Sequence, residues 1–267
     1  MSDSKITAPG LIDMKANGDK ITCLTAYDYP TIRLLEAAGI DVALVGDSLG
    51  NVILGYDNTI PVTMAEMLHH TKAVAYGSEN SLVVADMPFL SYQISTEQAV
   101  ENAGRLIKEG GAEAVKIEGG AEMAQTVLRI VDCGIPVMGH LGMTPQSVNA
   151  FGGYKVRGRD EAVAERILEG AEALQNAGVF AIVLEMVPEE LASRVTESLT
   201  IPTIGIGAGR YCNGQVLVIH DMLGLYDKFV PKFAKQYAQL GTLATDAIRQ
   251  YITEVKDGTF PGVENTY

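Results

Sequence analysis

The feature that most constrains the fold of this chain is a repeated alternation of short apolar segments with longer amphipathic ones. Eight short segments have the length and composition of buried β-strands, and helix-like segments separate most of them. Strands that alternate with helices indicate right-handed βαβ units and a parallel sheet. Eight such units in 267 residues predict an α/β fold of the (β/α)8 TIM-barrel type, with an open doubly wound sheet as the alternative. The expected strands are residues 21–26, 41–46, 81–86, 113–118, 135–140, 179–185, 201–206 and 215–219.

Helix boundaries carry their own local signals. Residues 8–17 predict a short leading helix, and Thr63 with Glu66 forms a capping box that opens a helix ending near Gly77. Beyond the last strand, the tail predicts two extra helices. No linker and no compositional break divides the chain, so we expect residues 1–267 to form a single barrel domain.

Composition narrows the possible functions. A hydrophobic share of 47% predicts a well-filled core, and no stretch approaches the roughly 18 consecutive apolar residues of a membrane span. The N-terminus lacks the apolar segment of a secretory signal, and the three cysteines form neither a disulfide framework nor a CxxC pair. We therefore expect a cytoplasmic protein. A net charge of −13 argues against a nucleic-acid partner, but a few buried cations would suffice to bind a small anion.

Ionisable side chains stand at the ends of five expected strands. In a barrel these ends meet at one face, where catalytic groups are found. Each residue alone could have a purely structural role, as a turn former, a helix cap or a hydrogen-bonded histidine. Five in succession favour a shared polar pocket. They are Asp47, Asp86, Glu118, His140 and Glu185.

Two local patterns add to this expectation. The stretch Val45-Gly-Asp-Ser-Leu-Gly50 places a carboxylate and a hydroxyl just after a buried strand, which suits a turn and a pocket mouth equally well. Lys116 and Glu118 are two residues apart on a strand and therefore share a face. A lysine and a glutamate inside a barrel would be costly without partners or a task.

The residue types indicate a particular chemistry. Asp47, Asp86 and Glu118 form a set of oxygen ligands that suits Mg²⁺ better than zinc. A divalent cation beside Lys116 would hold a small 2-oxo acid and would acidify the C–H bond next to its carbonyl group. Glu185, on a different strand, is free to act as the base.

Two glycine-rich segments predict loops of different kinds. Residues 205–209 lack the GxGxxG spacing and the early βαβ context of a dinucleotide site, and predict a tight loop at the barrel mouth. Residues 143–158 are too long for a simple connection, which predicts a lid or an oligomer contact.

Several motifs, in order along nearly the whole chain, resemble the ketopantoate hydroxymethyltransferase (3-methyl-2-oxobutanoate hydroxymethyltransferase) family. They are Leu24-Thr-Ala-Tyr-Asp28, Val45-Gly-Asp-Ser-Leu-Gly50, Ala85-Asp-Met-Pro-Phe89, Val115-Lys-Ile-Glu-Gly-Gly120, Gly139-His-Leu-Gly-Met-Thr-Pro-Gln146, Phe151-Gly-Gly-Tyr154, Leu184-Glu-Met-Val-Pro188 and Ile204-Gly-Ile-Gly-Ala-Gly209. The resemblance implies a barrel of the phosphoenolpyruvate/pyruvate superfamily. It also implies an Mg²⁺-dependent enzyme of pantothenate biosynthesis. Such an enzyme transfers a one-carbon unit from 5,10-methylenetetrahydrofolate to 3-methyl-2-oxobutanoate and yields 2-dehydropantoate (ketopantoate).

The resemblance also implies roles for individual residues. Asp47 and Asp86 match the metal ligands, with Glu118 at the third metal position. The contacts to the oxo acid match Asp47, Ser48, Asp86 and Lys116.

Three further positions and the assembly follow from the same resemblance. Glu185 matches the proton acceptor, while His140 and Tyr27 match pocket residues without a defined role. The family implies a homo-oligomer, often a decamer, that acts on small molecules.

Two other functions remain open at this point. A carbon–carbon lyase or mutase of the same superfamily would use the same cation but no folate, and release of tetrahydrofolate would separate the two. A non-catalytic binding barrel would show no turnover in a coupled assay.

Overall fold

A computed structural model gives the structure of this protein and describes residues 5–226 and 228–267. The chain divides into two compact units, with the division between Leu217 and Val218. The expectation of one domain stays a prediction. Among the described helices, none is both long and apolar enough to cross a membrane.

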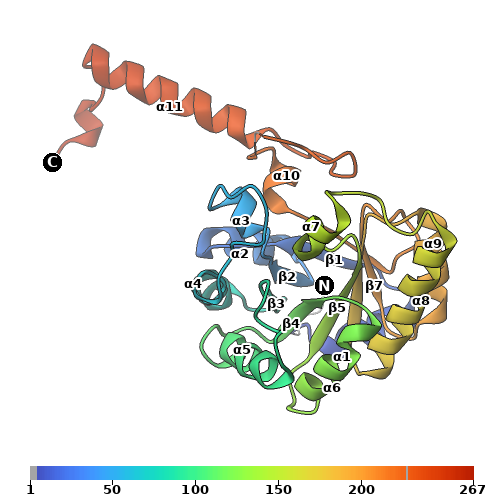
Figure 1. The fold of residues 1–267 in the computed structure, drawn as a ribbon. Helices are drawn as coiled ribbons and strands as arrows, with labels where there is room; N and C mark the ends of the chain where they lie inside the picture. The colour runs from blue at the N-terminus through green and yellow to red at the C-terminus, as the bar shows by residue number, and fades with distance from the viewer. Residues whose placement is uncertain (1–4, 227) are drawn as a thin grey trace. The chain divides into compact units, whose positions relative to one another are not determined.

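The described part of the first unit is a closed barrel of eight strands in sequential order (Figure 1). Every neighbouring pair is parallel, and β1 pairs with β8 to close the ring. The predicted TIM barrel is therefore confirmed, and the open sheet is wrong. The strands are β1 Ile21–Thr25, β2 Val42–Val45, β3 Leu82–Asp86, β4 Ala114–Glu118, β5 Val137–Gly142, β6 Ala181–Glu185, β7 Thr203–Ile206 and β8 Gly214–Leu217.

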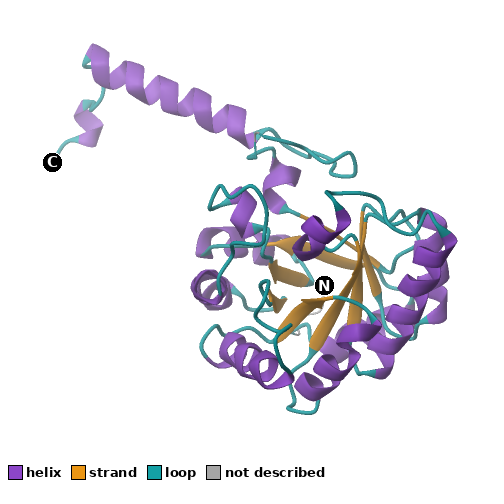
Figure 2. Cartoon of the chain, viewed as in Figure 1, coloured by secondary structure: helices purple, strands orange, loops and turns teal. Residues whose placement is uncertain are grey.

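Helices surround the strands of this unit (Figure 2). The predicted capping box is present, because the Thr63 hydroxyl accepts from the Glu66 amide and the Glu66 carboxylate accepts from the Thr63 amide. The helices are α1 Ala8–Asn17, α2 Tyr29–Ala38, α3 Leu49–Val52, α4 Met64–Gly77, α5 Thr96–Lys108, α6 Ala124–Val131, α7 Val148–Phe151, α8 Glu161–Asn176 and α9 Glu189–Ser198, with 3-10 turns η1 Ala121–Met123 and η2 Pro145–Ser147.

One connection departs from the regular alternation. Residues 207–213 are all described, and they join β7 to β8 without a helix. The Asn213 side chain accepts from the Thr203 amide at 3.1 Å, which ties the end of this connection to the start of β7. The ring of helices is therefore interrupted between the last two strands.

The apolar core fills the end of the barrel where the strands begin, and the polar residues lie beyond it along the same strands. Alternate residues of the strands, such as Leu82 and Val84 on β3 and Ala181 and Val183 on β6, belong to one buried cluster. Side chains alternate between the two faces of a strand, so the next inward positions are Asp86 on β3 and, on the other strands, Lys116, Glu118, His140 and Glu185.

The leading helix closes the base of this core. Ala8 and Leu11 of α1 belong to the same buried cluster. The Lys15 ammonium donates to the carbonyl oxygens of Thr196, Leu199 and Ile201, close to the beginning of β7. The helix α1 therefore covers the end of the barrel where the strands begin.

The second unit contains α10 Ile219–Leu223, α11 Leu240–Asp257 and the 3-10 turn η3 Val263–Asn265. The two helices predicted for the tail are present. On α11, Leu243, Tyr251 and Val255 are 64%, 55% and 45% exposed in the single chain.

Candidate active site

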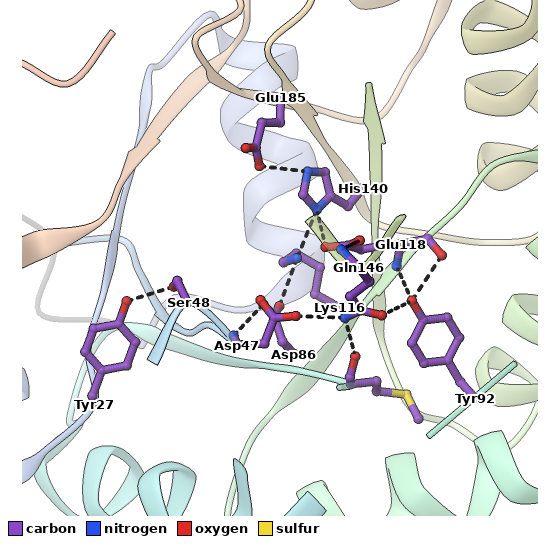
Figure 3. A network of polar contacts seen from close by, with 11 residues as sticks. Tyr27, Asp47, Ser48, Asp86, Tyr92, Lys116, Glu118, His140, Gln146 and Glu185 are labelled. Atoms are coloured by element: carbon purple, nitrogen blue, oxygen red, sulfur yellow. Dashed lines mark hydrogen bonds and ion pairs between the residues drawn. The ribbon is translucent and has the colours of Figure 1, made fainter. Parts of the chain in front are cut away.

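The structure brings the eight predicted site residues to one end of the barrel (Figure 3). Polar contacts join six of them, and Tyr27 and Ser48 make a separate contact with each other. Asp86, Lys116, Glu118, His140 and Glu185 project inward from the last residues of β3, β4, β5 and β6. The other three follow the strands directly: Tyr27 lies two residues after β1, and Asp47 and Ser48 come just after β2. Ionisable side chains at successive strand ends were the signal that located most of this site. The alternation of strand side chains added Lys116, and Tyr27 followed from the family resemblance alone.

Asp47 and Asp86 are in direct contact. The Asp47 amide donates to Oδ2 of Asp86 at 3.0 Å, and both side chains are buried. Burial, followed by the neighbouring carboxylates of Asp86 and Glu118, raises the pKa of Asp47 well above its usual range. The carboxylates of Asp47, Asp86 and Glu118 therefore repel one another, and their negative charges favour binding of a cation.

Lys116 supplies part of that charge. Its Nζ lies 3.0 Å from Oδ1 of Asp86 and 3.1 Å from Nδ1 of His140. Burial alone would lower the pKa of Lys116, but the carboxylates of Asp86, Glu118 and Asp47 outweigh that effect and raise it. The ammonium group accordingly stays protonated inside the barrel.

His140 lies between Lys116 and Glu185. Because an ammonium has only donors, Nδ1 of His140 is assigned as an acceptor and the ring proton is assigned to Nε2, which lies 3.2 Å from Oε2 of Glu185. Burial and then Lys116 lower the pKa of His140, which favours the neutral ring. With 15% of its side chain exposed, against 4% for His140, Glu185 is the more accessible of the two.

The backbone around Glu185 has two residues with positive φ angles. Met186, the next residue, has a φ of 47°, a left-handed conformation that is uncommon for a residue with a side chain. Gly142 has a φ of 94°, and a Cβ atom there would lie inside van der Waals contact with the Glu185 carbonyl oxygen. The Met143 amide donates to that same oxygen at 2.8 Å. Glycine is therefore required at position 142 to hold the end of β6.

Glu118 is held by two residues that the sequence did not single out. The Gln146 amide N–H donates to Oε2 of Glu118 at 3.0 Å, and the Tyr92 hydroxyl lies 3.2 Å from the Glu118 amide. Burial raises the pKa of Glu118 to about 7, against the opposing effect of Lys116. Gln146 and Tyr92 lie in loops, and neither stands at a strand end, so the pattern that found the other residues missed them.

Tyr27 and Ser48 form a second polar contact at the rim. Their hydroxyl oxygens lie 2.8 Å apart, and Tyr27 is only 1% exposed. Either hydroxyl can donate, and the contact holds the side chain of Ser48, the residue next to Asp47.

The donor atoms of the site fit a divalent cation by their chemistry. Among the described residues, no three His, Cys, Asp or Glu side chains converge closely enough to hold an ion in this conformation. However, two buried carboxylate oxygens accept no hydrogen bond of good geometry. They are Oε1 of Glu118, 3.4 Å from Nδ1 of His140, and Oδ1 of Asp86, 3.0 Å from Nζ of Lys116. Buried carboxylate oxygens left open in this way fit a hard cation such as Mg²⁺, which keeps several water ligands.

Two solved structures align with this fold at low sequence identity. The chain aligns with phosphonopyruvate hydrolase in a complex with oxalate and Mg²⁺ at a TM-score of 0.63 and 12% identity, covering 99% of this chain and 93% of that one. It aligns with 2,3-dimethylmalate lyase, a member of the PEP mutase/isocitrate lyase superfamily, at a TM-score of 0.61 and 18% identity, covering 96% and 89%. These likenesses support the barrel fold.

Curated relatives are much closer. Two proteins named 3-methyl-2-oxobutanoate hydroxymethyltransferase, from Carboxydothermus hydrogenoformans and Syntrophus aciditrophicus, are 59% and 57% identical over 263 residues. Both alignments cover 98% of this chain, and they cover 95% and 97% of the respective relatives. A family model described as ketopantoate hydroxymethyltransferase matches residues 5–263. The chain therefore belongs to the ketopantoate hydroxymethyltransferase family.

Proposed function

We propose that this protein is a cytoplasmic, Mg²⁺-dependent 3-methyl-2-oxobutanoate hydroxymethyltransferase that takes its one-carbon unit from 5,10-methylenetetrahydrofolate. The observation that carries the proposal is the division of charges around His140. Lys116 and the carboxylate of Asp86 lie on one side of the ring, and the more accessible carboxylate of Glu185 lies on the other. This arrangement separates a place for an anionic substrate from a place for a base.

Asp47 and Asp86 would hold Mg²⁺, with Glu118 at the third position. Once bound, the cation would polarise the keto group of the oxo acid and make its C3–H bond more acidic. Lys116, whose raised pKa keeps it protonated, would pair with the substrate carboxylate. Ser48, oriented by Tyr27, would donate a hydrogen bond to the same substrate.

Glu185 would remove the C3 proton of 3-methyl-2-oxobutanoate. The C3–H bond breaks and its proton passes to a Glu185 carboxylate oxygen, while the electron pair becomes an enolate. The enolate carbon forms a new bond to the methylene carbon of the folate. Both bonds from that carbon to the two folate nitrogens break, and water supplies the hydroxyl group. The proton held by Glu185 and the remaining proton of the water pass to the two nitrogens, and 2-dehydropantoate and tetrahydrofolate are released. Nε2 of His140 lies 3.2 Å from Oε2 of Glu185 without a hydrogen bond of good geometry, and the ring would lie beside the Glu185 carboxylate during this step.

The base can be tested without the folate. Glu185→Gln should abolish exchange of the C3 proton with deuterium oxide, followed by NMR, while the oxo acid still binds. Glu190→Gln, an exposed neighbour on α9, is the matched control and should exchange at the normal rate. Exchange at the wild-type rate in Glu185→Gln would remove that residue from the role of base.

The metal site can be tested with Mn²⁺ as a paramagnetic substitute. Asp47→Asn should weaken Mn²⁺ binding, measured by electron paramagnetic resonance, at least tenfold, because it removes a charged ligand. The exposed Asp13→Asn on α1 should leave that affinity within twofold. Full turnover after rigorous chelation would contradict the metal mechanism.

Lyases of this kind often use a reactive cysteine in a barrel loop, and the cysteines of this chain do not suit that role. Burial is the main cause of the raised pKa of both Cys23 and Cys212, which disfavours a reactive thiolate. Cys133 is exposed, but it follows α6 and precedes the start of β5, away from the carboxylates at the strand ends. Release of tetrahydrofolate in the presence of oxo acid and methylene donor would distinguish the transferase from these alternatives.

We also propose that the protein is a homo-oligomer, most consistent with the decamer that the family resemblance implies. The exposed apolar residues of α11 support an additional contact, because Leu243 and Val255 on this 18-residue helix are 64% and 45% exposed in the single chain. Leu243→Glu should shift the mass measured by light scattering toward smaller species. An unchanged mass would exclude this face as an assembly contact.

A further inference from the structure

Gln146 uses nearly all of its hydrogen-bonding capacity inside the proposed active site, although it is neither charged nor part of a strand. The residue lies in the turn η2, after β5, and is 5% exposed. Its Nε2 donates to Oδ2 of Asp47 and to the Met87 carbonyl oxygen, both at 2.9 Å. Since those two atoms are acceptors, the orientation of the side-chain amide is determined.

Tyr92 completes the same arrangement from the opposite side. Its hydroxyl lies 2.7 Å from Oε1 of Gln146 and accepts from the Glu118 amide at 3.2 Å. Accepting from one group lets the hydroxyl proton point at the Gln146 oxygen. Tyr92 therefore fixes the amide whose nitrogen holds Asp47 (Figure 3).

The Gln146 backbone acts on the third carboxylate. Its N–H donates to Oε2 of Glu118 at 3.0 Å, while Oε1 of Glu118 accepts no hydrogen bond. A single residue thus occupies one oxygen of Asp47 and one oxygen of Glu118. Oε1 of Glu118 is thereby left to another ligand.

We propose that Gln146 is a positioning residue that orients Asp47 and Glu118 for Mg²⁺, with Tyr92 holding its amide in place. The inference rests on the proposed function, since it concerns the carboxylates assigned there to the cation. Hydrogen bonds to the outer side of metal ligands raise metal affinity because the ligands need not be reoriented on binding, and losing one typically costs 10- to 100-fold. Gln146 contacts neither the cation nor the reacting atoms in this role.

The test compares Mn²⁺ binding to metal-free wild-type protein, Gln146→Met and Gln175→Met by electron paramagnetic resonance. Gln146→Met keeps the side-chain length and removes the amide, so the dissociation constant should rise about 10- to 100-fold. Gln175 is the matched control: its Oε1 accepts from the backbone of Thr200 and Ile201 near the start of β7, at the opposite end of the barrel. Gln175→Met should bind Mn²⁺ within twofold of the wild type.

Thermal unfolding without metal separates positioning from general stability. Both glutamine variants lose hydrogen bonds of the side-chain amide and should melt at lower temperature, but only Gln146→Met should lose metal affinity. Equal Mn²⁺ affinity in folded Gln146→Met and wild type would overturn the inference and leave the proposed function intact. If the wild type binds no Mn²⁺, the proposed metal site fails and the inference fails with it.

Tyr92→Phe keeps the inference testable if Gln146→Met does not fold. This variant removes one oxygen atom and leaves the ring packing in place. It should weaken Mn²⁺ binding about threefold or more, because Oε1 of Gln146 loses its 2.7 Å hydrogen bond and keeps only the 3.3 Å one from Nε2 of Gln93. Affinity within twofold of the wild type would count against the role of Tyr92 and, with Gln146→Met unfolded, against the whole inference.

Discussion

The ammonium nitrogen of Lys116 lies 3.0 Å from Oδ1 of Asp86, and the two side chains are only 5% and 4% exposed. Burying such a pair removes both charges from water, and apolar side chains of the same volume would often stabilise a fold as well or better. The pair stands at the ends of two strands, on top of a core built from alternate apolar residues. Its presence there is better explained by substrate and cation binding than by stability.

Lys116→Met should nevertheless destabilise the metal-free protein. The change leaves the carboxylates of Asp47, Asp86 and Glu118 together without their cation, so the free energy of unfolding at pH 8 should fall by about 3 kcal/mol or more. Chemical denaturation measures this loss. Lys72→Met, an exposed position on α4, should change it by less than about 0.5 kcal/mol. Equal losses in the two variants would mean that the carboxylates do not depend on Lys116.

Gly142→Ala should impair both folding and catalysis. The new Cβ atom would strain a backbone with a φ of 94° and would press against the carbonyl oxygen of Glu185. Gly134→Ala provides the control, since its φ is 83° but its Cβ atom would meet nothing within 4 Å. We expect Gly134→Ala to cost about 1–2 kcal/mol and to keep normal turnover. Gly142→Ala should cost more and lower kcat at least tenfold, measured by steady-state kinetics.

Glu36 on α2 should make the stability depend on pH in the acidic range. Burial alone would raise the pKa of its carboxyl group, but hydrogen bonds from Ser81 and the Asn80 amide outweigh burial and lower it to about 2. The folded pKa lies below the unfolded value of about 4.5, so this contribution is present above that pH and is lost as the pH falls toward about 2.

Glu36→Gln should therefore reduce the free energy of unfolding by about 1–2 kcal/mol at pH 7, a figure discounted because the group is partly exposed to solvent. The difference from the wild type should shrink as the pH falls below about 4.5. Urea denaturation at several pH values measures it, with the exposed Glu101→Gln as the control. A difference that stays constant down to pH 2.5 would contradict the prediction.

The thiols should differ sharply in reactivity. Cys133 is exposed, whereas Cys23 and Cys212 are 4% and 1% exposed and have raised pKa values because of burial. Ellman's reagent should react rapidly with one thiol per native chain and with the other two only after denaturation. Cys133→Ser should abolish the rapid phase and keep full activity. Loss of activity in this variant would reopen the possibility of a cysteine-dependent reaction.

The period of the strands explains why so much of the site was predictable. Lys116 and Glu118 were expected on one face from their spacing, and both project inward beside Asp86. Gln146 and Tyr92 were not predictable in this way, because loop residues follow no period. Gln146 donates to Asp47, which is 99 positions away along the chain. No local sequence pattern predicts a contact between residues so far apart.

The tail shows a different limit. Leu243, Tyr251 and Val255 are spaced by multiples of four residues, which predicts one face of a helix, and α11 contains all three. An amphipathic pattern predicts that the apolar face of a helix packs against other residues. It does not say whether those residues belong to the same chain or to another one. In the single chain this face is exposed.

The position of α1 has a consequence for the order of events during turnover. Because α1 covers the end of the barrel where the strands begin, both substrates and both products must pass through the opposite end. With the roles proposed above, the oxo acid binds on Asp47 and Lys116, each 4% exposed, and so lies beneath any folate that arrives later. The oxo acid must then enter first and 2-dehydropantoate must leave last. Product inhibition should show this compulsory order, with 2-dehydropantoate competing directly with the oxo acid.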